Sequence, residues 1–120
     1  MPIKDPNIID TTWHHRAEMA LASAQQARRT ITYAELAETI GVMAPQRIHQ
    51  VTIWLEASIR QDHHAGLPIR AALVISRNRF GLPAPGFFET CRAVGAYDGP
   101  ARGDIAAKFH KALLRQLFEG

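Results

Sequence analysis

The stretch that decides the fold is a short β-branched segment that runs directly into a helix, TITYAELAETIG at residues 30–41. Its first four residues are β-branched or aromatic, a composition typical of an edge strand. Thr32 and Glu35 have the spacing of a capping box, in which each side chain binds the other residue's backbone N–H. Gly41 suits the left-handed conformation that ends many helices. The stretch therefore predicts a strand over 30–33 and a helix that ends at Gly41.

A longer helix is predicted after this one. Pro45 fits the first position of a helix, where a missing N–H costs nothing. Apolar residues then recur at helical spacing to about Ala65, namely Ile48, Val51, Leu55 and Ile59. The segment Gly66-Leu67-Pro68 would stop the helix. These two helices, joined by a short turn, have the order of a helix–turn–helix.

A second strand is predicted beyond the helix–turn–helix. Residues 71–75 form a continuous apolar run of strand length, and the basic turn 76–81 follows it. We expect 71–75 to pair with 30–33. Residues 28–82 are then a winged-helix-like centre, a helix–turn–helix with a small two-stranded sheet and a basic wing.

The flanking segments are predicted to be helical apart from an N-terminal arm over residues 1–10. A helix capped by Thr11 or Thr12 runs to about Arg28, and a short one covers 87–94. Asp104 caps a closing helix over 104–118, whose apolar face consists of Ile105, Phe109, Leu113, Leu114, Leu117 and Phe118. The fold class is α+β and mostly helical, with residues 1–120 in a single domain.

Composition places the protein among ordinary globular domains of 120 residues. No apolar run approaches the about 20 residues that span a bilayer, and the first five residues lack the apolar stretch of a secretory signal. We therefore expect a cytoplasmic protein without a membrane partner. The net charge is +3, and residues 28–79 carry seven arginines against four acidic residues, so the basic excess lies in the predicted winged-helix centre.

The order of features in residues 28–82 resembles the DNA-binding domain of the alkylguanine-DNA alkyltransferases and of their non-catalytic alkyltransferase-like relatives. The family carries a tyrosine before the first helix of the motif and an arginine near the start of its recognition helix. Tyr33 and Arg47 stand at the matching positions. The resemblance implies a winged-helix fold and DNA as the partner.

The same resemblance implies that this chain does not transfer alkyl groups. The family places a Pro-Cys-His-Arg-Val-Val strand after the recognition helix, and Pro68–Ile75 can be laid over it. Ala71 then stands at the place of the nucleophilic cysteine, so the chemistry of a thiolate is lost. We predict no catalytic residues, no enzyme activity and no cofactor.

The candidate DNA-binding residues lie on the recognition helix, the wing and the preceding strand. The first turn of the helix offers groups for base edges and phosphates, namely Gln46, Arg47, His49 and Gln50. Arg77 and Arg79 would contact DNA from the wing, and Tyr33 would position the backbone or a displaced nucleotide. The competing interpretation is that the helical and wing residues are solvated surface groups and that Tyr33 belongs to the core.

A second functional hypothesis is a protein-interaction module or homodimer. Trp54 and Ile53 lie off the apolar stripe of their helix, so they can form an exposed patch unless the N-terminal arm or the closing helix covers Trp54. The Phe87-Phe88 segment and the closing helix offer further apolar surface.

Metal and thiol sites are not predicted. The pairs His14-His15 and His63-His64, the latter next to Asp62, contain metal-binding residue types, but adjacent histidines on a helix point about 100° apart. We interpret them as surface histidines. The single Cys91, beside Arg92, is interpreted as a small apolar residue rather than a reactive thiol.

Overall fold

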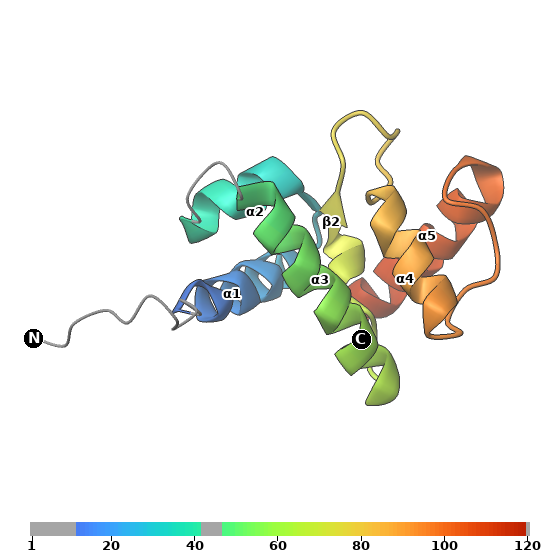
Figure 1. The fold of residues 1–120 in the computed structure, drawn as a ribbon, viewed down its shortest axis with the longest axis horizontal. Coiled ribbons are helices and arrows are strands. Elements are labelled where there is room, and N and C mark those ends of the chain that lie inside the picture. Colours follow the sequence, from blue (N-terminus) through green and yellow to red (C-terminus); the bar gives the residue numbers. More distant parts are fainter. Residues whose placement is uncertain (1–11, 42–46, 120) are drawn as a thin grey trace, which may run out of the picture.

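The computed structural model describes residues 12–41 and 47–119, with the backbone alone for Thr12, Arg47 and Ile48. The elements follow in the order α1 (Thr12–Gln26), β1 (Ile31–Thr32), α2 (Tyr33–Ile40), α3 (Arg47–His64), the 3-10 helix η1 (Arg70–Leu73), β2 (Val74–Ile75), α4 (Pro85–Ala93) and α5 (Gly103–Glu119) (Figure 1). The mostly helical α+β class is confirmed. The predicted arm over 1–10 and the predicted helix start at Pro45 lie outside the described residues.

The start and end of α2 are as predicted. Thr32 is its N-cap: the Glu35 backbone N–H donates to Thr32 Oγ1 at 3.1 Å, and the Thr32 N–H donates to Glu35 Oε1 at 3.0 Å. Gly41 ends the helix with φ of 73°, a conformation that glycine adopts without steric cost. The side chains of Leu36 and Ile40 are fully buried. Local sequence signals therefore define this helix at both ends.

The two predicted strand segments do pair, in parallel. Ile31 lies opposite Val74 and Thr32 opposite Ile75. The predicted strand over 71–75 is wrong in its first half, because Arg70–Leu73 form the 3-10 helix η1. Residues 71–74 are all buried, so no alternation of exposed and buried side chains separates strand from helix in this run.

The helices on either side of this centre differ from the predictions at their ends. α1 ends at Gln26 rather than near Arg28, because Arg28 turns the chain with φ of 56°. α4 begins at Pro85, before the predicted start at Phe87, and proline fits the first turn of a helix. A break at Gly66, with φ of 71°, follows α3 as predicted.

The closing helix α5 differs from its prediction in two respects. It begins at Gly103, so Asp104 is not its cap but lies in its first turn. Leu113 and Leu117 are buried as expected, whereas Ile105 is 60% exposed and its neighbour Ala106 takes the buried position in the first turn. His110, which the apolar pattern does not include, is buried on the same face.

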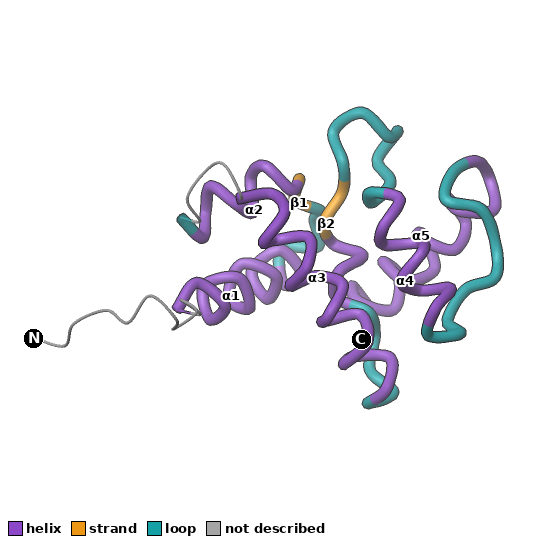
Figure 2. The backbone as a smooth tube through the Cα atoms, in the orientation of Figure 1, coloured by secondary structure: helices purple, strands orange, loops and turns teal. Residues whose placement is uncertain are grey.

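Figure 1 shows α3 across the middle of the molecule, with α1 and α2 on one side and α4 and α5 on the other. The strands are the two short segments between these halves in Figure 2. η1 packs against α1, α3 and α5, so its alanines lie where the helices meet. Among the described helices, none is both long and apolar enough to cross a bilayer.

Candidate functional site

A small pocket opens between α2, α3, η1 and the start of α4. Its lining combines apolar side chains with three polar ones: Leu55, Ile59, Ala71, Ala84 and Phe87, together with Tyr33, Thr52 and Glu56. The volume open to water inside the pocket is about 10 Å³, which is space for about one water molecule. Tyr33 and Ala71, which the resemblance matches to the family's tyrosine and to the place of its cysteine, therefore line the same pocket.

Tyr33 is partly buried at the first position of α2. Its hydroxyl oxygen accepts the backbone N–H of Ala84 at 3.2 Å, which ties α2 to the segment before α4. Burial raises the pKa of the Tyr33 phenol, and the charge of Glu56 raises it further, against the lowering effects of the Ala84 hydrogen bond and Arg79. The phenol is therefore neutral at physiological pH, and its own proton can be donated.

Glu56 is a pocket residue that the sequence analysis missed. Its side chain on α3 reaches the first turn of α4: a Cβ built on Gly86 would lie only 2.6 Å from Glu56 Oε2. A larger residue at position 86 would displace the Glu56 carboxylate from this place. The positive end of the α4 dipole favours a carboxylate there. The available signal was the four-residue spacing of Thr52 and Glu56, which places both on one face of a helix.

The predicted residues of the recognition helix are only partly described. His49 and Gln50 are exposed near the start of α3. Gln46 lies outside the described residues, and Arg47 is described by its backbone alone, as the first residue of α3. Figure 1 shows this end of α3 beside α2, facing the same end of the molecule as the loop that follows β2.

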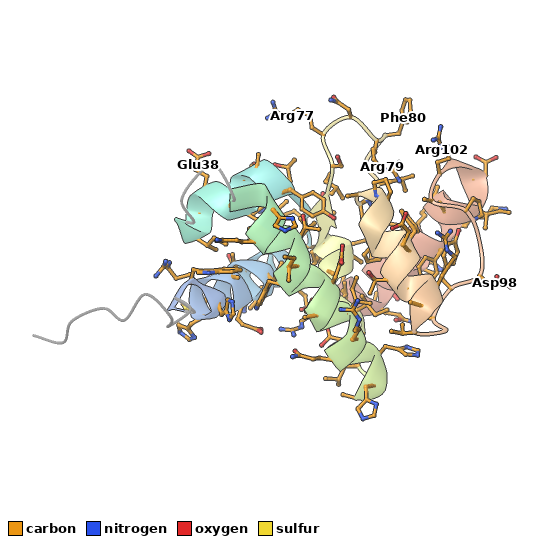
Figure 3. All side chains as sticks on the ribbon, in the orientation of Figure 1. Glu38, Arg77, Arg79, Phe80, Asp98 and Arg102 are labelled. Carbon is orange, nitrogen blue, oxygen red and sulfur yellow. The ribbon has the colours of Figure 1, made fainter. Side chains whose placement is uncertain are left out.

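The two predicted wing arginines have different environments in the segment between β2 and α4, residues 76–84, here called the β2–α4 loop. Arg77 is exposed and points outward (Figure 3). Arg79 is partly buried: its Nε donates to Pro83 O at 2.9 Å and its Nη2 donates to Ala101 O. Arg79 therefore fixes the loop against the turn before α5, and Arg77 is the more accessible of the two.

The beginning of η1 is held by a buried carboxylate. Asp62, 3% exposed at the end of α3, accepts the Arg70 backbone N–H and the Arg70 Nε, both at 3.1 Å. Arg70 also forms an ion pair with Glu18 of α1. The carboxylate of Asp62, which lies next to the histidine pair His63-His64, is therefore bound to Arg70.

A buried histidine holds the next part of η1. His110 Nε2 lies 2.7 Å from Ala72 O, and a carbonyl oxygen only accepts, so Nε2 carries the proton. Burial lowers the pKa of His110, against the raising effect of this hydrogen bond. His110 is therefore a neutral structural donor at physiological pH.

The remaining candidates for metal or thiol chemistry are accounted for within the described residues. No group of three or more His, Cys, Asp or Glu side chains there is placed to hold a metal ion. His63 and His64 are exposed at the end of α3, as expected. Cys91 is fully buried, and burial raises the pKa of its thiol to about 12, so a thiolate does not form at neutral pH.

Most of the apolar side chains that were expected to bind a protein partner or a second copy are covered in the structure. Phe87 and Phe88 are buried in the core. Trp54 is partly covered by α1, through Trp13 and His14, whose ring centroids each lie 6.1 Å from that of Trp54. Four large apolar side chains besides Phe80 remain exposed within the described ranges, namely Met19, Ile53, Leu67 and Ile105.

Comparisons with known proteins assign neither a family nor a function to this sequence. No family model matches the sequence, and no curated protein or solved structure is significantly similar to it.

Proposed function

We propose that this protein binds duplex DNA without catalysing a reaction, with the first turn of α3 in a groove and the β2–α4 loop on the adjacent backbone. One observation carries the proposal: Tyr33 and Ala71, far apart in the sequence, line one pocket against the middle of α3. The resemblance to alkyltransferase-like proteins matches Tyr33 to the tyrosine of their DNA-binding motif and Ala71 to the place of the family's cysteine.

The chemistry at the start of α3 supports a groove contact. Gln50 and His49 are exposed there, and an amide side chain can both donate to and accept from a base edge. Arg47, and Gln46 before it, would extend this surface, and Arg77 would bind a phosphate from the β2–α4 loop. Arg79 contributes by holding the loop in place.

The pocket itself is too small to hold a base. Its volume admits about one water molecule, and the bond from Ala84 N–H to the Tyr33 hydroxyl closes one side of it. We therefore propose that the protein binds the duplex through groove and phosphate contacts, with the bases left in the helix. Recognition of an alkylated guanine in this pocket is the stronger, alkyltransferase-like version of the proposal.

The test is fluorescence anisotropy of a labelled duplex, plain or carrying one alkylated guanine, titrated with the full chain at about 50 mM and about 200 mM salt. With Arg47 and Arg77 each on a phosphate, affinity should fall about 12-fold between these concentrations. Both duplexes should bind equally. Arg47→Ala and Arg77→Ala should each weaken binding and reduce the slope of log affinity against log salt by about one. Arg115→Ala, which removes an exposed charge on α5, is the matched control.

The outcomes separate the hypotheses. Absence of duplex binding at low salt overturns the proposal and leaves the interaction module, which has less surface available because Phe87 and Phe88 are buried. A clear preference for the alkylated duplex shows that the pocket opens, and it extends the function to lesion recognition.

A further inference from the structure

The most exposed aromatic side chain in the described residues is at the tip of the β2–α4 loop. Phe80 is fully exposed, with a relative accessibility of 103%. Its backbone lies in the left-handed region, with φ of 55°, a conformation that glycine adopts readily and that is unfavourable for a bulky side chain. Neither core packing nor local backbone preference explains a phenylalanine at this position. Strain of this kind, combined with full exposure of an apolar ring, motivates a functional role for Phe80 through what it contacts.

The loop is built to hold Phe80 in one place. The Ser76 N–H donates to Leu82 O at 2.9 Å, the Leu82 N–H donates to Arg79 O at 3.0 Å and the Arg79 N–H donates to Ser76 O at 3.3 Å, so three backbone bonds close the tip. Leu82 is buried, and the Arg79 side chain ties the loop to Pro83 and Ala101. A ring carried on such a loop loses little conformational entropy on binding.

The surroundings of Phe80 are cationic. Residues 76–84 read SRNRFGLPA and contain no acidic residue. Arg77 is exposed on one side of the tip, and the exposed Arg102 follows Ala101, to which Arg79 binds (Figure 3). The hydrogen bonds with Thr32 lower the pKa of the Glu35 carboxyl most, desolvation opposes them, and the charges of Arg29 and then Arg77 lower it further, so Glu35 is the acidic group near Arg77. That carboxylate belongs to α2, away from the tip.

An aromatic ring between two accessible arginines matches the chemistry of a nucleic acid. Apolar side chains wedge between base pairs in proteins that kink DNA, and arginines beside them bind the flanking phosphates. A hydrophobic pocket of a protein partner would accept the ring equally well, but it would gain nothing from the arginines unless it were also acidic. The charge pattern therefore favours the nucleic acid.

We propose that Phe80 inserts its ring at a base step of the bound duplex, with Arg77 and Arg102 on the phosphates to either side. This inference rests on the proposed DNA binding. It adds an inserted ring to the loop contact of that proposal, and implies that the duplex is locally unstacked and bent where the loop meets it.

The test uses the full chain and a duplex with 2-aminopurine, a base whose fluorescence rises when it is unstacked, placed in turn at successive positions. Wild-type protein should raise the emission at one or two neighbouring positions. Phe80→Ala should abolish that rise and weaken binding about 10-fold, within the range for loss of a stacked ring, with the salt dependence unchanged. Phe80→Trp should retain both effects. Leu67→Ala, at the other end of α3 and also exposed, is the matched control and should behave as wild type.

Phe80→Gly checks the loop backbone separately, because glycine accepts the positive φ and the fold should be retained. It should lose the emission change like Phe80→Ala. If Phe80→Ala binds the duplex and raises the emission as wild type does, the insertion is overturned and the proposed DNA binding stands. If the wild-type protein does not bind the duplex at all, both proposals fall.

Discussion

Polar groups serve different purposes on the two sides of the short helix η1: some hold its backbone in place, and others line the pocket that Ala71 faces. On either side of Ala71 the chain is clamped: Arg70 is bound by the buried Asp62, and the Ala72 carbonyl accepts from the buried His110. Ala71 itself faces the pocket, where the hydroxyl of Tyr33 and the carboxylate of Glu56 surround a space for about one water molecule. The clamps use buried charge and hydrogen bonds for stability, whereas the pocket leaves polar groups accessible. We expect substitutions in the clamps to change folding and those in the pocket to leave it nearly intact.

The largest effect should come from the Asp62 clamp. Asp62→Ala removes one partner of an ion pair while Arg70 remains partly buried, and we expect a loss of about 3 kcal/mol in the free energy of unfolding. Glu56→Ala, in the pocket but on the same helix, should cost less than about 1 kcal/mol. Urea denaturation measures both, and Asp62→Asn is the control, since it retains an oxygen acceptor and should lose less. Equal losses for the two alanine variants would remove the distinction between clamp and pocket.

The His110 clamp should give the protein a pH-dependent stability. Burial lowers the pKa of His110 in the folded chain below its ordinary value of 6.5, so protons favour the unfolded chain. Its contribution is complete above about pH 6.5 and is lost as the pH falls from there toward the lowered folded pKa, at no more than about 1.4 kcal/mol per pH unit.

Urea denaturation from about pH 7 to about pH 5 measures this dependence. In His110→Gln the side-chain amide can still donate to Ala72 O, but it does not titrate, so the slope just below pH 6.5 should disappear. A wild-type slope that persists in His110→Gln would assign the pH dependence to other groups.

The smallest effect concerns Glu56 and Gly86 at the pocket rim. Gly86→Ala should be nearly neutral in the wild type, because the gain in helix propensity of about 1 kcal/mol is offset by displacing the Glu56 carboxylate from the start of α4. In a Glu56→Ala background the same change should stabilise the fold by about 0.5 to 1 kcal/mol. The double-mutant cycle, measured by thermal unfolding, gives the coupling directly. A coupling energy of zero would mean that the start of α4 does not stabilise the Glu56 carboxylate.

The sequence predicted the parts of the fold that depend on neighbouring residues. The capping box of Thr32 and Glu35 and the glycine at position 41 were recognisable because each has a local signature. The pairing of the two strand segments was expected from the order of the elements. The 3-10 turn over Arg70–Leu73 was not, because a run of buried apolar residues has no period. The turn is fixed by Asp62, a partner that becomes adjacent only after the chain reverses at Gly66.

The candidate site was predictable to a similar degree. Tyr33 and Ala71 were found through a resemblance, and their meeting in one pocket could not be read from periodicity. Glu56 was missed because a carboxylate on a helix is normally solvated, and its contact with Gly86 depends on how α4 packs on α3. Phe80 was passed over as part of a basic turn, because sequence alone does not say whether an aromatic residue in a turn folds inward or stands free.

The parallel pairing of β1 with β2 has a consequence for how the chain folds. Each strand is only two residues long, and α2, α3 and η1 all lie between them in the sequence. Closing so long a loop costs entropy that two residues of ladder cannot offset by themselves. The strands can therefore associate only after the intervening helices have packed, which makes the sheet a late event in folding and its formation a reporter that the helical centre is complete.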